Sequence, residues 1–278
     1  MNERSRRLDV LVTGAGSGIG QAVAERLAAA GHRVTGTVRT AERARLLTEK
    51  AAATNPAFRF LPLELSSEDE VRSVARDVLA SGGLDVLVHN AGFGVFGAVE
   101  EVGPDAVRRQ FEVNVFGPLE LTRLLLPELR ARRGQIIWVG SLAGRIALPF
   151  QAHYSATKAA LASFSDALRM ELEPFGVRVT CLEPGDFSTN FTDARIVTRA
   201  EASPYGDALA RCLAAVDEQE RGGPKPEWVG RVVERLTRAA KPPARRPVGQ
   251  GARTMCALVR LLPERVRERI VSRHYRQS

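Results

Sequence analysis

Tyr154 and Lys158 stand four residues apart in the sequence, a spacing that could support acid–base chemistry. On a helix, positions i and i+4 share a face, so the phenol and the ammonium group would be neighbours. Free tyrosine has a pKa of about 10 and is a poor proton carrier at neutral pH. An ammonium group one turn away favours the phenolate and brings that pKa down. We therefore predict that Tyr154 exchanges a proton with a substrate.

A glycine-rich stretch near the start of the chain predicts a phosphate-binding turn. It reads Thr13-Gly14-Ala15-Gly16-Ser17-Gly18-Ile19-Gly20 and lies between an apolar run and a helix-periodic segment. Glycines let the chain turn tightly, and the following helix offers free N–H groups to a pyrophosphate. The order of strand, turn and helix is typical of dinucleotide sites. The predicted contacts are Gly14, Ser17, Gly18, Ile19 and Gly20.

Residues 33–38 alternate like a strand, and the residue that follows them indicates which dinucleotide binds. An NAD-specific site would place an acidic residue there to bind the ribose 2′-hydroxyl. The sequence has Arg39 instead. A planar guanidinium group suits a 2′-phosphate. We predict that NADP(H) is preferred and that NAD(H) can bind.

The positions of these residues depend on strand and helix signals that alternate along the chain. Strands are expected at 8–13, 33–38, 58–65, 85–89, 135–139 and 177–182, and helices at 21–30, 42–53, 68–79, 105–129 and 154–173. This alternation indicates right-handed crossovers and a parallel sheet. We predict a single α/β domain of Rossmann type, doubly wound, with helices on both faces and a C-terminal helical extension. Its predicted divisions are a catalytic domain at 1–240, a substrate lid at about 189–226, and a basic extension at 241–278 that packs on the same domain.

Six motifs in order resemble those of the short-chain dehydrogenase/reductase family. They are Thr13–Gly20, Asn90-Ala91-Gly92, Asn114, Ser141, Tyr154-x-x-x-Lys158 and Pro184-Gly185. The resemblance covers about residues 9–189, and the loops at 93–97 and 143–150 are similar to those of the hydroxysteroid and retinol dehydrogenase branch. It implies an oxidoreductase that transfers hydride between a nicotinamide dinucleotide and an alcohol or carbonyl.

The resemblance also implies a role for each matching residue. Tyr154 would be the general acid–base, Ser141 would orient the substrate oxygen, and Lys158 would depress the tyrosine pKa, helped by oxidised nicotinamide, and hold the nicotinamide ribose. Asn114 would sustain a water path from Lys158 to solvent. The remaining cofactor contacts are Glu64 and Leu65 at the adenine, Asn90, Ala91 and Gly92 at the cofactor edge, Pro184 and Gly185 against the nicotinamide, and Phe187 and Thr189 at its carboxamide.

The two apolar loops predict a hydrophobic substrate, because a pocket for such a molecule needs an apolar lining. We expect a secondary alcohol or ketone (or an aldehyde) that is steroid-, retinoid- or lipid-like. One alternative is a reductase of 3-oxoacyl thioesters, whose acidic acyl carrier would suit the basic extension. Another is a nucleotide-sensing protein without catalysis, which is disfavoured because both Tyr154 and Lys158 are present.

The net charge of +8 is confined to the C-terminal extension. Residues 241–278 hold ten Lys or Arg and two Glu, whereas the preceding residues hold 30 basic and 30 acidic side chains. A neutral body argues against nucleic-acid binding. Apolar residues at helical spacing in two segments divided by Pro263 predict two short helices: Met255, Leu258, Val259 and Leu262, then Val266 and Ile270. These helices would close the substrate cleft or pack on the domain, and they could also contact an anionic membrane peripherally.

Other features of the sequence indicate where the protein works. The three cysteines, Cys181, Cys212 and Cys256, have neither zinc-site nor disulfide-framework spacing, and no metal is expected. No apolar stretch approaches the roughly 18 residues of a membrane-spanning helix. We predict a cytoplasmic protein, and the family resemblance implies a homodimer or homotetramer.

Overall fold

A computed structural model describes residues 6–53 and 55–277 of the chain. The first half alternates strands and helices in the order β1 (Asp9–Val12), α1 (Gly18–Ala29), β2 (Arg33–Val38), α2 (Ala41–Ala52), β3 (Phe58–Pro62), α3 (Glu68–Ala80), β4 (Val86–His89) and β5 (Val95–Phe96). The middle contains α4 (Pro104–Phe111), a π-helical turn η2 (Glu112–Phe116), α5 (Gly117–Ala131), β6 (Gln135–Val139), a 3₁₀ turn η3 (Leu142–Gly144), α6 (Ala152–Leu172), a second 3₁₀ turn η4 (Glu173–Phe175) and β7 (Arg178–Pro184). The last part contains α7 (Phe191–Ala194), β8 (Ile196–Val197), α8 (Gly206–Gly222), α9 (Glu227–Thr237), β9 (Arg245–Val248), α10 (Ala252–Leu261) and α11 (Glu264–Gln277).

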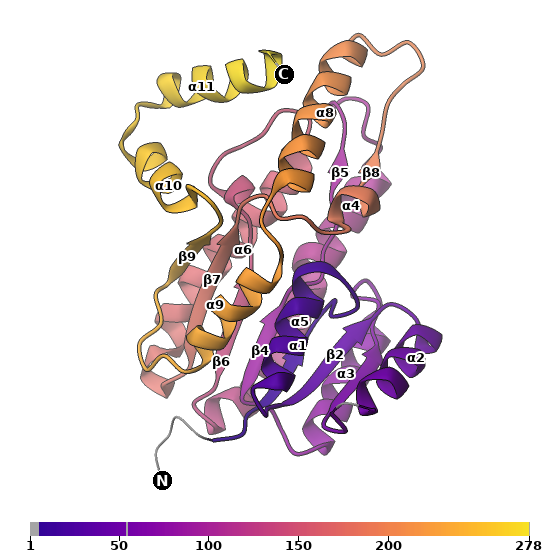
Figure 1. Ribbon diagram of the computed structural model, residues 1–278, viewed down its shortest axis with the longest axis vertical. Coiled ribbons are helices and arrows are strands. Elements are labelled where there is room, and N and C mark those ends of the chain that lie inside the picture. Colours follow the sequence, from indigo (N-terminus) through magenta and orange to yellow (C-terminus); the bar gives the residue numbers. More distant parts are fainter. Residues whose placement is uncertain (1–5, 54, 278) are drawn as a thin grey trace.

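Seven of the strands form one parallel sheet, in the order β3-β2-β1-β4-β6-β7-β9. Helices cover both faces of the sheet (Figure 1). The chain winds outward from β1 in one direction and then from β4 in the other. The predicted doubly wound α/β domain with a C-terminal helical extension is therefore confirmed.

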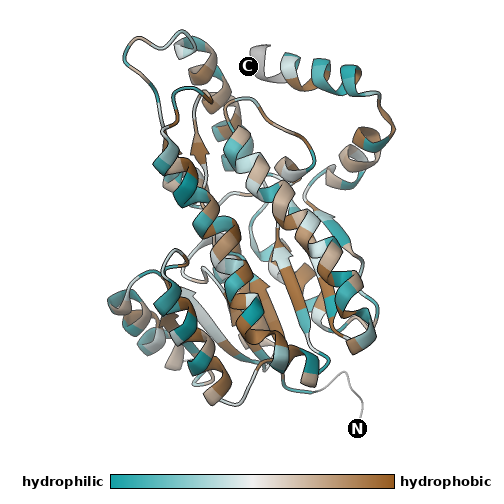
Figure 2. Ribbon diagram, turned by 180° about the vertical axis from the view of Figure 1, so that it is seen from behind, coloured by the Kyte–Doolittle hydropathy of each residue, from teal (hydrophilic) through white to brown (hydrophobic). Residues whose placement is uncertain are grey.

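The apolar runs form the inner strands because such strands are buried on both faces. In β1, Val10 and Val12 belong to the core under α1 and α9, while Leu11 belongs to the core under α3, α5 and α6. In β6, Ile137 and Trp138 divide between the two cores in the same way. Seen from behind, the central strands are largely hydrophobic, whereas the helices that lie over them carry both hydrophobic and hydrophilic residues (Figure 2).

Four features of the fold differ from the sequence prediction. Helices α8 and α9 were not among the expected helices, and α8 forms much of the segment predicted to be the lid. The segment 105–129 is not one helix, because η2 separates α4 from α5. Residues 245–248, assigned to the extension, form β9 and pair with β7 at the edge of the central sheet. The short strands β5 and β8 pair with each other and join the loop after β4 to the predicted lid.

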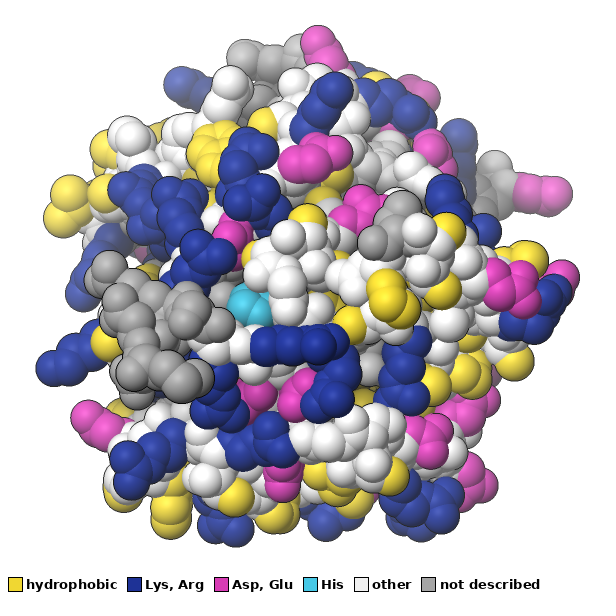
Figure 3. Space-filling model, turned by 60° about the horizontal axis from the view of Figure 1, so that its bottom comes forward, with side chains coloured by type: hydrophobic (Ala, Val, Ile, Leu, Met, Phe, Trp, Pro, Cys, Tyr) yellow, Lys and Arg dark blue, Asp and Glu magenta, His cyan; other side chains and the backbone are white. Residues whose placement is uncertain are grey.

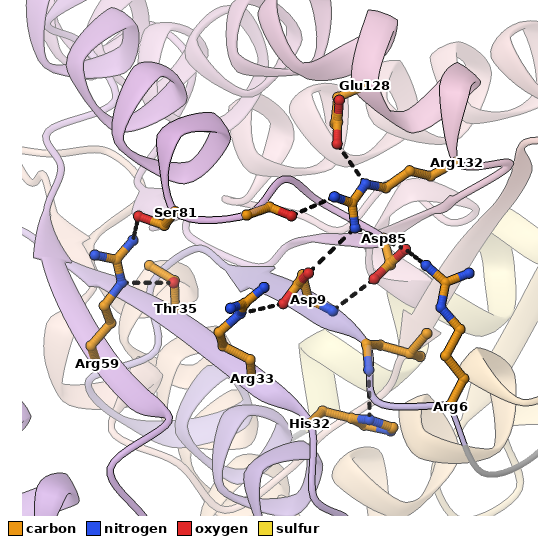
Figure 4. Close-up of polar contacts among 12 residues, drawn as sticks. Arg6, Asp9, His32, Arg33, Thr35, Arg59, Ser81, Asp85, Glu128 and Arg132 are labelled. Carbon is orange, nitrogen blue, oxygen red and sulfur yellow. Dashed lines mark hydrogen bonds and ion pairs between the residues drawn. The ribbon is translucent and has the colours of Figure 1, made fainter.

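An ion-pair cluster joins the amino ends of the strands (Figure 4). The Asp85 carboxylate accepts hydrogen bonds from the Asp9 backbone N–H and from Arg6, both at 2.9 Å. The Asp9 carboxylate pairs with Arg33 and with Arg132. The cluster thus links β1, β2, β4 and the end of α5. The space-filling view of this end of the molecule shows basic and acidic side chains interspersed over the surface (Figure 3).

Gly117 provides a test of how closely the start of α5 packs against the segment that follows β3. A Cβ atom there would lie 2.1 Å from the Leu65 carbonyl oxygen, whereas a Cβ on Gly222, in α8, meets nothing within 4 Å. Because backbone cannot move aside cheaply, we predict that Gly117→Ala lowers the free energy of unfolding by about 1–3 kcal/mol. Gly222→Ala, the control, should leave it unchanged or slightly raised. Urea unfolding measures both, and a Gly117→Ala protein as stable as wild type would contradict the packing described.

Candidate active site

The carboxyl ends of the strands open into one cavity of about 840 Å³. It lies where the strand order reverses between β1 and β4, the usual ligand position in open α/β sheets. Its walls come from the glycine-rich turn, from the ends of β4, β6 and β7, and from α6, α8, α10 and α11. Segments far apart in the sequence therefore meet at this site.

The glycine-rich turn is held against the end of β4 by a set of hydrogen bonds. The Thr13 hydroxyl oxygen accepts from the backbone N–H groups of Asn90 and Ala91, at 3.0 and 3.1 Å. The Asn90 amide donates to the carbonyl oxygens of Thr13 and Gly14, at 3.0 and 3.1 Å. Gly14 has φ +66°, and a Cβ there would lie 2.9 Å from the Ala91 Cα atom. The turn and the Asn90-Ala91-Gly92 segment therefore form one rigid edge of the cavity.

Nearly all of the predicted cofactor contacts line this cavity: Gly14, Ser17, Gly18, Ile19, Arg39, Glu64, Leu65, Asn90, Ala91, Gly92, Tyr154, Lys158, Pro184, Gly185, Phe187 and Thr189. Gly20 is the exception. A Cβ there would lie 2.2 Å from the Gly14 carbonyl oxygen, so Gly20 lets α1 approach the turn. A dinucleotide fits this lining, because glycine backbone and the N-terminus of α1 suit its phosphates.

Tyr154 lies near the start of α6, with 9% of its surface exposed. Its ring packs against those of Phe191 and Phe96, with centroids 5.5 and 6.2 Å away. Ser141 lies two residues after the end of β6, near enough to the phenol to affect its pKa, and its hydroxyl oxygen accepts from the Ala143 N–H at 3.1 Å. Burial raises the pKa of Tyr154 well above its usual value, and the nearby carboxylates of Glu220 and Asp186 raise it further, whereas Ser141 lowers it. The phenol therefore keeps its proton at neutral pH.

Lys158 lies one turn further along α6, buried beside the phenol. Its Nζ atom donates to the Val139 carbonyl oxygen at 3.0 Å and lies 5.7 Å from the centre of the Tyr154 ring. Burial lowers the pKa of Lys158 to about 8, because the charged form is poorly solvated there. Tyr154 and Lys158 are therefore neighbours on one face of α6, as their spacing predicted. The predicted fall in the tyrosine pKa is not produced by the chain itself, because desolvation of the phenol outweighs the favourable interactions.

Asn114 lies within the π-helical turn η2 and is buried. Its carboxamide oxygen accepts from the Phe93 N–H at 3.0 Å, and its NH₂ group donates to the Phe93 carbonyl oxygen and the Thr157 hydroxyl at 2.9 and 3.1 Å. Asn114 does not itself line the cavity. It fixes the loop after β4 to α6, beside Lys158. π-Helical turns are frequent at functional sites, but the helical periodicity of 105–129 gave no sign of one.

Glu183 is a buried residue near the site that sequence reasoning missed. Its carboxylate accepts from Arg145 Nε at 2.8 Å, and Arg245 Nη1 lies 3.4 Å away. Arg245, from β9, also binds Asp166 on α6 at 2.5 Å. This network joins the loop after Ser141 to β7, β9 and α6. An acid that interrupts the apolar strand just before Pro184 was the available sequence signal.

The rest of the cavity is mainly apolar, which fits the predicted hydrophobic substrate. Its apolar lining outside the cofactor contacts includes Phe93, Leu148, Phe191, Ile196 and Val216 from the body, and Met255, Leu258, Val259, Leu262, Ile270 and Val271 from the C-terminal helices. Arg195, next to β8, joins the β8 segment to α8 at the edge of this apolar lining. Its buried guanidinium group pairs with Asp217 and lies 3.6 Å from Glu220, both on α8, and it also stacks over the Phe96 ring at 5.2 Å.

Two further observations concern the described part of the chain. No three of its His, Cys, Asp or Glu side chains are grouped as metal ligands would be. None of its helices combines the length and the apolar character that crossing a membrane requires.

Comparison with known proteins defines the class to which this fold and site belong. The family described as short chain dehydrogenase matches residues 9–199. Relatives include a 3-ketodihydrosphingosine reductase of Bacteroides thetaiotaomicron, 34% identical over 86% of this chain and 87% of that protein. Another is an NADPH-dependent 3-dehydrocapnine reductase of Ornithobacterium rhinotracheale, 34% identical over 94% of both chains. A solved short-chain dehydrogenase from Streptomyces avermitilis has a TM-score of 0.82 and 34% identity, over 98% of this chain and 99% of that one.

The chain belongs to the short-chain dehydrogenase family and is an oxidoreductase. The predicted family is thus confirmed.

Proposed function

We propose that the protein uses NADPH to reduce the ketone of a lipid-like substrate to a secondary alcohol. The observation that carries this proposal is the position of the Tyr154 phenol, buried beside Ser141 and Lys158 in a cavity with apolar walls. Relatives named as reductases of 3-ketodihydrosphingosine and 3-dehydrocapnine support the substrate class.

Each residue of the catalytic group has a part in this reaction. When bound, NADPH supplies the hydride that adds to the carbonyl carbon. Ser141 hydrogen-bonds the carbonyl oxygen and orients it toward Tyr154, which donates its proton as negative charge develops there. The phenol is protonated at neutral pH because burial raises its pKa, so it can donate that proton to the carbonyl oxygen. The proposed direction, reduction, is supported by the relatives named as reductases.

Lys158 and Asn114 support the proton donor. The Lys158 ammonium group holds the nicotinamide ribose and stabilises the phenolate left after proton transfer, since opposite charges attract strongly in a buried site. Asn114 holds the Phe93 backbone and Thr157 around that ammonium group. We further propose that reprotonation passes along water beside Lys158.

The remaining cofactor contacts follow the family pattern. Glu64 and Leu65 contact the adenine, Pro184 and Gly185 lie against the nicotinamide, and Phe187 and Thr189 bind its carboxamide. Arg39 is exposed at the end of β2 and faces the cavity, so it can pair with a 2′-phosphate. The segment 189–226 acts as the substrate lid, joined to the body through the β5–β8 pair.

Two proposals concern the whole protein. We infer that two or four copies associate through the outer faces of η2 and α6, which expose Phe116, Phe164 and Met170. Buried apolar side chains stabilise such interfaces. We also propose that the protein works in the cytoplasm.

The basic C-terminal extension favours one alternative function, the reduction of a 3-oxoacyl thioester on an acidic acyl carrier. Turnover of a carrier-bound thioester without turnover of free long-chain ketones would favour this alternative. Turnover of free ketones alone would favour the first proposal.

Tyr154→Phe tests the proposed proton donor. Removing one oxygen leaves the ring packing intact, so we predict that NADPH binding changes less than threefold while turnover falls by a factor of about 10³ or more. Fluorescence titration and absorbance of the reduced nicotinamide measure the two quantities. Tyr205→Phe is the matched control, since its hydroxyl binds the exposed Glu100, and it should retain activity. A Tyr154→Phe protein with wild-type turnover would refute the assigned role.

Arg39→Ala tests the cofactor preference. A charge-assisted hydrogen bond is worth about 1.5–3 kcal/mol, so we predict that NADPH affinity falls about 10- to 150-fold while NADH affinity changes little. Arg76→Ala, which removes an exposed arginine from α3, should change neither affinity. Equal NADPH affinity in the Arg39→Ala and wild-type proteins would exclude Arg39 as the phosphate ligand.

A further inference from the structure

Helices α10 and α11 leave the sheet after β9 and extend past the body toward α8 (Figure 1). Helix α10 contacts β9, and α11 contacts α8. Ala252 is the one buried residue of α10. We call α10 and α11 the C-terminal helices. Both contribute side chains to the cavity lining, so they border its opening.

Each C-terminal helix has an apolar face and a basic face. The apolar face turns toward the cavity through Met255, Leu258 and Val259 on α10, Leu262 directly after it, and Ile270 and Val271 on α11. The basic face carries the exposed arginines Arg253, Arg260, Arg265, Arg269 and Arg273. The reverse view shows hydrophilic and hydrophobic residues mixed along these two helices (Figure 2).

Large apolar side chains of both helices remain exposed to solvent, including some that border the cavity. Leu261 is 81% exposed, Ile270 54% and Leu258 51%. Val266 and Met255 are also exposed. Such residues beside arginines are typical of helices that lie in the interfacial plane of a membrane, with apolar groups inserted and cations among the headgroups.

The charge distribution indicates an anionic occupant. The residues before Lys241 carry equal numbers of basic and acidic side chains, so the excess positive charge lies in the C-terminal extension. Cationic side chains held near an anionic bilayer gain favourable energy that is additive over several residues. A neutral apolar partner would make no use of these arginines.

We propose that the C-terminal helices form a docking surface for an anionic lipid bilayer, positioned so that a lipid-like ketone passes from the bilayer directly into the cavity. This inference rests on the proposed function for its substrate. It adds the source of the substrate and the surface that reaches it. Leu261 and Val266 insert among the lipids, and the exposed arginines bind their headgroups.

The test measures sedimentation of the full-length protein with vesicles of phosphatidylcholine alone or with 30 mol% phosphatidylglycerol (a composition of about one anionic lipid in three). Arg260→Glu/Arg269→Glu reverses two charges, and Leu261→Asp replaces the most exposed apolar residue with a charge. None of these positions lines the cavity. Matched controls are Arg76→Glu on α3 and Val99→Asp, a 62% exposed valine outside these helices.

We expect wild type to bind the anionic vesicles at least tenfold more tightly than the neutral ones. Both helix variants should lose at least tenfold of that binding, and the controls less than twofold. Turnover of a water-soluble short-chain ketone should stay within twofold in the two helix variants and in both surface controls. Tyr154→Phe should bind vesicles as wild type does, which separates docking from catalysis.

Absence of vesicle binding by wild type, or equal binding by the helix variants, would overturn the proposal. Binding to an acidic acyl carrier instead of vesicles would also overturn it. So would a change of oligomeric state in Leu261→Asp, seen by size-exclusion chromatography, because it would assign this face to a second copy of the chain. Vesicle binding without ketone turnover would contradict the proposed function and leave the docking surface standing.

Discussion

The burial of one phenol and one ammonium group in the same cavity is the constraint on which the rest of this structure depends. Desolvation raises the pKa of Tyr154 and lowers that of Lys158 to about 8. Both shifts disfavour charge, so the resting site holds a proton on the phenol ready for donation. A charge created there during reaction finds an opposite charge nearby in a medium that screens poorly. The fold supplies this enclosure by ending its central strands at one edge and covering that edge with helices from the second half of the chain.

The sheet and the centre of the site could be predicted from the sequence because their signals are local. Alternating apolar runs and helix-periodic segments determine a parallel sheet, and the glycine-rich turn is contiguous. Tyr154 and Lys158 are neighbours through helical geometry alone. Strands β5, β8 and β9 were missed because they are short, and β9 contains Pro247 and two arginines instead of an apolar run. The π-helical turn around Asn114 was missed because it is one short turn between two α-helical segments and has no residue signature of its own.

The direction of the tyrosine pKa shift could not be read from the sequence for a different reason. It depends on Phe96, Phe191 and Glu220, which reach the phenol from three separate segments. The sequence shows the nearby cation but not the solvent that these segments exclude. The Glu183 network depends in the same way on Arg145 and Arg245, which come together only when β9 joins the sheet. The extension is therefore part of the site's framework as well as the source of its two outer helices.

Titration of the single phenol tests the central claim most directly. The chain has three tyrosines, so Tyr205→Phe/Tyr275→Phe leaves Tyr154 as the one tyrosine whose ionisation ultraviolet absorbance can follow. We predict no phenolate absorbance between pH 7 and about 10, where free tyrosine is half ionised, and its appearance only above that range. A midpoint below about 9 in the folded protein would contradict the account, because the phenol would then be acidified by its neighbours and not held protonated by burial.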